Sequence, residues 1–150
     1  MARASEHAVP AHAFEGIAGV VRDPLRDETF YATRGGGAFL LARGVAPRRL
    51  QVSTTSRLED AVAAPGFSYD IDLRRDNLRL VERILPHLQG IRRGGSAALD
   101  LSWTAAGRYD LYWELALKPW DCAAGILVVN AAGGRVAQPN GTPVDVSAPR

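Results

Sequence analysis

Short apolar runs separated by turn residues occupy the first third of the chain. The runs suited to β-strands are residues 17–21, 29–32, 38–41 and 50–53. Asp23–Asp27 contains a proline between two aspartates, which favours a turn, so residues 17–33 are predicted to form a hairpin. The glycines Gly35–Gly37 permit the sharp reversal that the next strand requires.

A helical period replaces this pattern in the middle of the chain. Between residues 73 and 88, apolar side chains recur every three or four positions, with arginines and a glutamate opposite them. This pattern predicts an amphipathic surface helix that closes near Pro86. A second helix is predicted at 96–106, because Ser96 suits its N-cap and Gly107 suits its end.

The last third alternates between strand and helix. Residues 109–115 form an aromatic-rich strand, and a helix from Pro119 to the glycines at 133–134 is apolar nearly all round, so it is predicted to be buried. A short strand is expected at 135–137. Strands that come first and then alternate with helices predict an α/β protein with layered packing.

Length and composition favour one folded unit. Residues 1–15 follow neither period and are predicted to be an irregular N-terminal segment, whereas 16–150 form a single domain. The net charge is only +2, and the arginine doublets are scattered among acids, so no nucleic-acid partner is expected. The single cysteine, Cys122, excludes an internal disulfide. No signal peptide or run of about 20 apolar residues is present, which predicts a cytoplasmic protein without a membrane contact.

Two carboxylates are candidates for chemistry. Asp121 lies in the first turn of the buried helix, where the free N–H groups favour an acid in any case, but it could also bind Mg²⁺. Glu114 ends the aromatic strand, at the sheet edge where α/β proteins collect ligands, although a solvated edge residue would look the same.

Two glycine- or proline-containing segments are weaker candidates. Gly94–Ala98 consists of small residues at a strand-to-helix junction, which suits backbone binding of an anion or a sugar hydroxyl and also suits a plain turn. Asp23–Asp27 lacks the second aspartate of a metal-binding Asp-Pro-Leu-Asp loop, because Arg26 stands there, so it is assigned to structure. The three histidines are far apart and no paired cysteines occur, so zinc is not expected.

Taken in order, several blocks resemble the inositol monophosphatase family over about residues 16–138. The matching blocks are Gly19-Val20-Val21 with Asp23-Pro24, Gly35–Phe39, Ile91–Asp100, Ala106–Asp110 with Trp113-Glu114, and Lys118–Gly125 with Ala131–Val136.

The resemblance implies a layered α/β/α/β/α sugar-phosphatase fold, here restricted to its C-terminal portion. It also implies a homodimeric, Mg²⁺-dependent phosphomonoesterase that acts on inositol phosphate. By this resemblance Asp121 is a metal ligand close to the sugar, the backbone of Gly95, Ser96 and Ala97 contacts the substrate, and Glu114 binds inositol hydroxyls.

The chain also departs from the family pattern. The family's Gly-Asp-Glu segment and Asp-Pro-Leu/Ile-Asp-Gly-Thr loop, which supply further metal ligands, do not occur in residues 1–18. Two hypotheses follow. The chain is either a fragment of a phosphatase that is inactive on its own, or a non-catalytic binding or assembly module that retains this half of the fold.

Overall fold

The computed structural model describes residues 16–146, so the segment expected at 1–15 lies outside the described residues. The helices are α1 (Ile71–Ile84), α2 (Ala97–Ala105) and α3 (Pro119–Ala131), with 3-10 turns η1 (Leu58–Asp60) and η2 (Leu85–His87). The strands are β1 (Ala18–Asp23), β2 (Glu28–Thr33), β3 (Gly37–Ala42), β4 (Arg48–Arg49), β5 (Val62–Pro65), β6 (Gly90–Ile91) and β7 (Leu111–Trp113).

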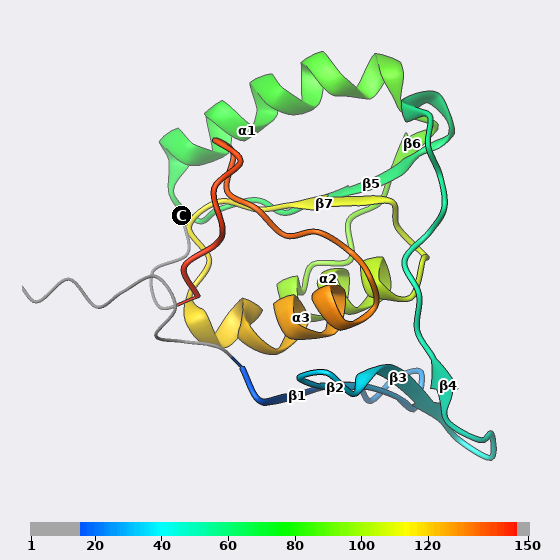
Figure 1. The fold of residues 1–150 in the computed structure, drawn as a ribbon. Coiled ribbons are helices and arrows are strands. Elements are labelled where there is room, and N and C mark those ends of the chain that lie inside the picture. Colours follow the sequence, from blue (N-terminus) through cyan, green and yellow to red (C-terminus); the bar gives the residue numbers. More distant parts are fainter. Residues whose placement is uncertain (1–15, 147–150) are drawn as a thin grey trace, which may run out of the picture.

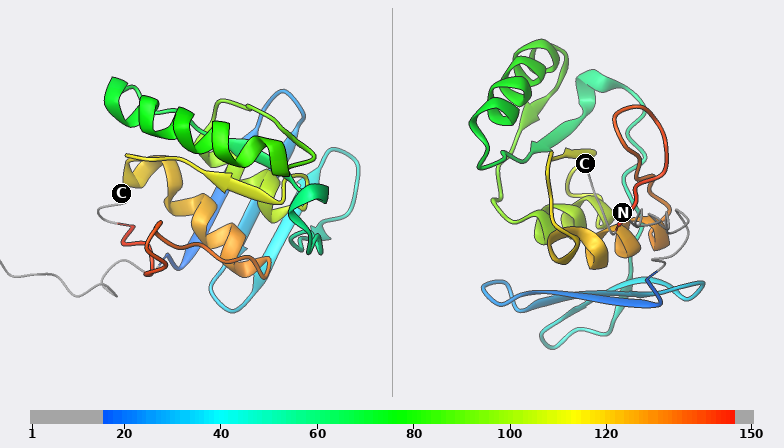
Figure 2. Two further views of the ribbon diagram at one scale, coloured as in Figure 1. Left: turned by 90° about the horizontal axis from the view of Figure 1, so that it is seen from above. Right: turned by 90° about the vertical axis from the view of Figure 1, so that its left-hand side faces the viewer.

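These elements stack as alternating sheets and helices (Figure 1). A four-stranded sheet, β1-β2-β3-β4, lies below α2 and α3, and a three-stranded sheet, β6-β5-β7, lies above them. α1 covers the far side of the second sheet, as both views of Figure 2 show. This order corresponds to four consecutive layers of the expected α/β/α/β/α fold.

The first sheet is an antiparallel meander with one face in the core. Phe30 pairs with Val21 and Leu40 in register, and all three side chains are buried against α2 and α3. Because successive residues of a strand point to opposite faces, the neighbouring row, Val20, Tyr31 and Phe39, lies on the outer face. The predicted hairpin and its turn are confirmed.

The second sheet is parallel, and its strands are joined through α1 and α2. β5 lies in the middle, with Ala63 and Ala64 fully buried. Parallel strands end at the same edge of the sheet. The edge after β5 and β7 therefore holds Gly66 and Glu114, and the Gly66 N–H donates to the Trp113 carbonyl at 2.8 Å.

The two central helices pack closely because small residues lie where they cross. A side chain on Gly125 of α3 would collide with Leu101 of α2, and the α-carbon of Ala124 lies directly against Gly19 of β1. α3 lies in the core through Cys122, Gly125, Ile126, Val128 and Val129, as its apolar composition predicts, whereas its first turn is exposed at Trp120. Within residues 16–146, no helix combines the length and apolar character needed to span a membrane.

Two predicted strands are wrong. Pairing with β3 occurs at Arg48–Arg49 and not at 50–53, although the Leu50 N–H still donates to the Ala38 carbonyl. Residues 135–137 are irregular and pair with no strand of the described chain.

The helix expected at 73–88 differs at both ends. It begins at Ile71, because the Asp70 side chain accepts hydrogen bonds from the N–H groups of Asp72 and Leu73. Its α-helical part ends at Ile84 and is followed by the 3-10 turn that contains Pro86, since proline cannot donate the next helical hydrogen bond.

Candidate functional site

The sequence-predicted site residues gather at one end of the layered structure. Glu114 follows β7, Asp121 lies in the first turn of α3, and Gly95–Ala97 lead into α2. In Figure 1 the ends of β5 and β7 and the starts of α2 and α3 all face the left-hand side. This is the sheet edge at which α/β proteins bind ligands.

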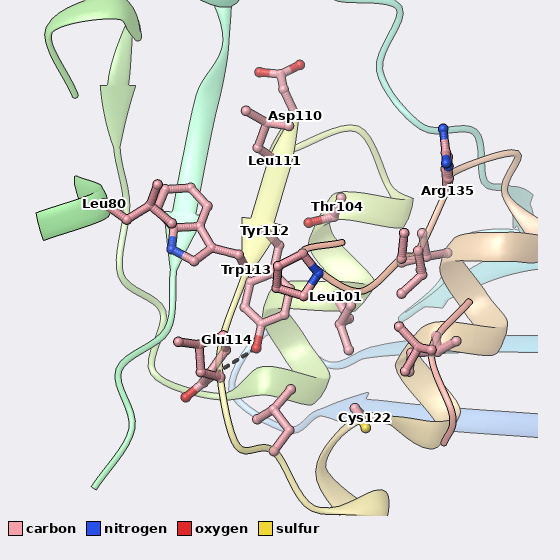
Figure 3. Close-up of a pocket in the computed structure, with 18 of the residues that line it drawn as sticks. Leu80, Leu101, Thr104, Asp110, Leu111, Tyr112, Trp113, Glu114, Cys122 and Arg135 are labelled. Carbon is pink, nitrogen blue, oxygen red and sulfur yellow. Dashed lines mark hydrogen bonds between the residues drawn. The ribbon is translucent and has the colours of Figure 1, made fainter. Parts of the chain in front are cut away.

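Glu114 is held in a defined orientation. The Tyr112 hydroxyl donates to its Oε2 at 2.7 Å, drawn as the dashed line in Figure 3. Gly66 lies directly beneath the carboxylate, where any side chain would collide with it. Burial, and then the bond to Glu114, raise the pKa of the Tyr112 phenol, so the hydroxyl remains a donor near neutral pH. The remaining acceptor capacity of Glu114 is available to a ligand.

The start of α2 offers backbone donors. Ser96 caps the helix, with Oγ accepting from the Leu99 N–H at 3.4 Å, and Gly95 has φ +94°, a conformation that favours glycine. The first N–H groups of a helix have no partner inside the helix. Those of Ala97 and Ala98 also find no acceptor elsewhere in residues 16–146.

Asp121 completes a capping arrangement at the start of α3. Its Oδ2 accepts from the Lys118 N–H at 3.0 Å, and its Oδ1 makes no hydrogen bond with the described residues. The neighbouring Trp120 is 80% exposed, so this helix start is open to solvent. The carboxylate therefore has one oxygen free to take a ligand.

These residues do not by themselves make a magnesium site. Mg²⁺ requires near-octahedral oxygen coordination, which one or two carboxylates supply together with phosphate oxygens and several waters. The described part of the chain contains no group of three or more His, Cys, Asp or Glu side chains that could hold a metal ion. Asp121 alone does not fit Mg²⁺.

Asp23 has the structural role predicted for it. Its side chain is buried and accepts from the N–H groups of Leu25 and Arg26 at 3.1 and 3.2 Å, and from the Arg26 guanidinium at 3.0 Å. Burial would raise the pKa of Asp23, but these bonds outweigh it and hold the pKa below its ordinary value. The hydrogen-bonding capacity of this carboxylate is thus used within the β1–β2 turn.

A pocket of about 730 Å³ opens between β7 and the segment that follows α3. Glu114 lines one end of it, whereas Gly95–Ala97 and Asp121 do not line it (Figure 3). Cys122 is buried at the same end, and burial raises the pKa of its thiol, so it is not a nucleophile.

Sequence reasoning missed two buried polar residues near the site. Asn77 of α1 donates to the Gly66 carbonyl at 2.5 Å and accepts from the Trp113 indole at 2.6 Å. Asp100 of α2 is 1% exposed and lies behind the Gly94–Ser96 turn. The only sequence signal for Asp100 is an acid within an otherwise apolar helix.

Comparison with known proteins places this geometry in a family. The inositol monophosphatase family model matches residues 11–150. An inositol-1-monophosphatase of Synechocystis sp. is 45% identical over 133 residues, covering 88% of this chain and 45% of the relative. A Pseudomonas aeruginosa protein named Nus factor SuhB is 44% identical, covering 82% and 45%.

Solved structures agree with the sequence comparison. The suhB protein of Bartonella henselae superimposes with a TM-score of 0.77 at 44% identity, covering 85% of this chain and 48% of that one. The inositol monophosphatase of Anabaena gives a TM-score of 0.77 at 38% identity, covering 89% and 51%. The chain thus spans about half the length of the curated relatives it matches. It belongs to the inositol monophosphatase family.

Proposed function

We propose that this chain carries the sugar-facing half of a Mg²⁺-dependent phosphomonoesterase that converts inositol monophosphate and water to inositol and phosphate. The observation that carries the proposal is a complementary pair at one sheet edge. Glu114 offers an oriented acceptor, and the start of α2 offers free N–H donors. Neutral hydroxyl groups both donate and accept, so a polyol is the ligand that suits this pair.

The proposed roles follow from these contacts. Glu114 accepts hydrogen bonds from sugar hydroxyls, and the backbone of Gly95, Ser96 and Ala97 contacts the same sugar. Asp121 is one metal ligand near that sugar, and further carboxylates must complete the metal site, because the described residues do not. The homodimer and the cytoplasmic location expected from the sequence stay predictions.

A non-catalytic binding or assembly module is the second candidate. Relatives from Pseudomonas aeruginosa and Escherichia coli, 44% and 43% identical, carry the name Nus factor SuhB and not the name of a phosphatase. Under this hypothesis the chain keeps its layered fold and binding surface without hydrolysis, even when a complete set of metal ligands is supplied.

The phosphatase and the binding-module hypotheses are separated by the activity of a joined protein and of its Asp121→Asn variant. The chain would be joined to the N-terminal half of an inositol monophosphatase relative, and Mg²⁺-stimulated phosphate release from inositol 1-phosphate would be measured. We expect the joined protein to be active and Asp121→Asn to lose most of that activity while remaining folded, because the amide removes charge but little volume.

Asp76→Asn is the matched control, because Asp76 is an exposed aspartate of α1 that, within residues 16–146, pairs with Arg79 alone. It should keep the parent rate. A joined protein that folds but never releases phosphate would favour the binding module. Parent-like activity and Mg²⁺ dependence in Asp121→Asn would show that Asp121 is only a helix cap.

A further inference from the structure

Asp100 has no role in the site described so far, yet burial of its carboxylate is energetically unfavourable. Its side chain is 1% exposed, and its Oδ1 has no hydrogen-bond partner within residues 16–146. A buried carboxylate with an unsatisfied oxygen destabilises a fold, so such a group requires an explanation. An aspartate in the first helical turn is ordinary, but a solvent-exposed one would serve that purpose equally well.

The carboxylate lies against the inner side of the turn that leads into α2. A side chain on Gly94 would collide with Asp100 Oδ1 and with the Trp103 ring, so this position accepts only glycine. The Asp100 N–H donates to the Ser96 carbonyl at 2.8 Å, which is the first backbone hydrogen bond of α2 and fixes Asp100 one helical turn from the Ser96 cap.

The charges around Asp100 reinforce this placement. Burial raises the pKa of Asp100, and the nearby backbone of Gly95 and Ser96 opposes this rise. Arg93, in the same turn, also opposes it, whereas Glu114 beyond β7 adds to it. Tyr109 and Tyr112 face it from the β7 side, and burial raises the pKa of both phenols.

We propose that Asp100 is a positioning residue, which draws the Gly95 and Ser96 N–H groups inward and so leaves the Ala97 N–H directed at the substrate. The proposal rests on the proposed function for the identity of that substrate. The positioning itself concerns only the turn. The Asp100 carboxylate, packed against Gly94, thus sets the direction of the Ala97 N–H at the start of α2.

The first test uses the 150-residue chain and two of its variants. Amide chemical shifts of Gly95 and Ser96 would be followed by NMR from about pH 3 to 8. We expect both to follow one titration with a midpoint above the usual aspartate value of about 3.9. Glu114→Gln should keep this titration, and Asp100→Asn should abolish it. Amides that do not titrate, or that titrate with Glu114, would overturn the proposal.

Hydrogen exchange supplies a second readout. Asp100→Asn should accelerate exchange of the Gly95 and Ser96 amides about tenfold, because the turn loses the buried charge that holds it in place. Asp110→Asn is the control, because Asp110 accepts from the Val62 N–H at 2.7 Å in the neighbouring sheet. It should leave the two amides unchanged. Equal acceleration in both variants would show a general loss of stability and contradict the positioning role.

Addition of inositol 1-phosphate distinguishes failure of this inference from failure of the proposed function. In the parent chain the ligand should shift the Ala97 amide, and Asp100→Asn should weaken that binding about tenfold. If the titration is present but the ligand never shifts Ala97, the turn is positioned as inferred and the proposed substrate is wrong. If the ligand binds equally well to both proteins, the inference is wrong and the proposed function stands.

Discussion

At the scale of single residues, carboxylates in similar sequence settings have different roles because their partners differ. The turn that Asp23 caps uses the acceptor capacity of its carboxylate, whereas the Glu114 carboxylate receives one hydrogen bond within the described residues, from Tyr112, and keeps acceptor capacity. Asp121 keeps one oxygen free. The number of unused lone pairs, and not the residue type, therefore separates structural acids from candidate ligands.

Glu114→Gln should change substrate choice and not metal dependence. In the joined protein, the variant should lower the rate on inositol 1-phosphate about ten- to hundredfold, because losing a charged hydrogen bond costs about 1.5–3 kcal/mol. Hydrolysis of a simple aryl phosphate, which has no sugar hydroxyl, should be almost unchanged. Equal losses on both substrates, measured as kcat/KM, would contradict a sugar-binding role.

Asp23→Asn should destabilise the chain in a pH-dependent way. The folded pKa of Asp23 is lowered, so its stabilising effect is present above the ordinary aspartate pKa and is lost as pH falls through the lowered value. Urea unfolding should show the variant less stable by about 1–3 kcal/mol at pH 7. The difference in unfolding free energy between the parent chain and the variant should become smaller as the pH is lowered below about 3.9. A gap that is the same at pH 7 and pH 3 would show that charge is not the cause.

At the scale of elements, helices were predicted better than strands. The three helices have long periodic or uniformly apolar patterns and recognisable caps, such as Ser96 and Pro119. β5 was missed because Val62–Pro65 is a short, alanine-rich run that ends in proline. Residues 135–137 alternate in the same way as a strand, but strand pairing depends on a neighbour that local sequence does not specify.

The residues of the candidate site also differ in whether the sequence alone predicts them. Glu114 and Asp121 were predicted as candidates because they lie at a strand end and at a helix start, and their roles stay predictions. Asn77 and Asp100 were not found, since the burial of a polar side chain depends on which distant segments cover it. For Asn77 these segments are the ends of β5 and β7, 11 and 36 residues away in sequence.

Asn77→Ala should weaken the attachment of α1 to the second sheet. It removes two hydrogen bonds and leaves the Gly66 carbonyl and the Trp113 indole without their partner. We expect a loss of about 2–4 kcal/mol in unfolding free energy by urea denaturation. Asp76→Ala, on the exposed side of the same helix, should cost less than about 0.5 kcal/mol. Similar losses in the two variants would show that Asn77 does not bridge the layers.

At the scale of the whole molecule, the described layers leave one sheet face without a cover. Val20 is 63% exposed and Leu41 43% exposed on the outer face of the first sheet, beside the stacked rings of Tyr31 and Phe39. An apolar patch of this kind promotes association in water.

We therefore expect the purified chain to self-associate, measured by sedimentation at several concentrations. Replacing Val20 and Leu41 together by threonine should shift the chain toward monomer, because threonine keeps the strand and removes apolar surface. Ile71→Thr is the control, since Ile71 is also exposed, at 54%, but lies on α1. A chain that is monomeric before any substitution, or equal shifts in both variants, would contradict this role of the sheet face.

The most direct test of the central claim is phosphate release from inositol 1-phosphate by the 150-residue chain alone, with and without Mg²⁺. The account predicts no release above the uncatalysed background, because Asp121 is one carboxylate and the described residues hold no cluster that binds a metal. The same chain joined to a relative's N-terminal half should release phosphate when Mg²⁺ is added. Mg²⁺-stimulated turnover by the chain alone, lost in Asp121→Asn, would contradict the account.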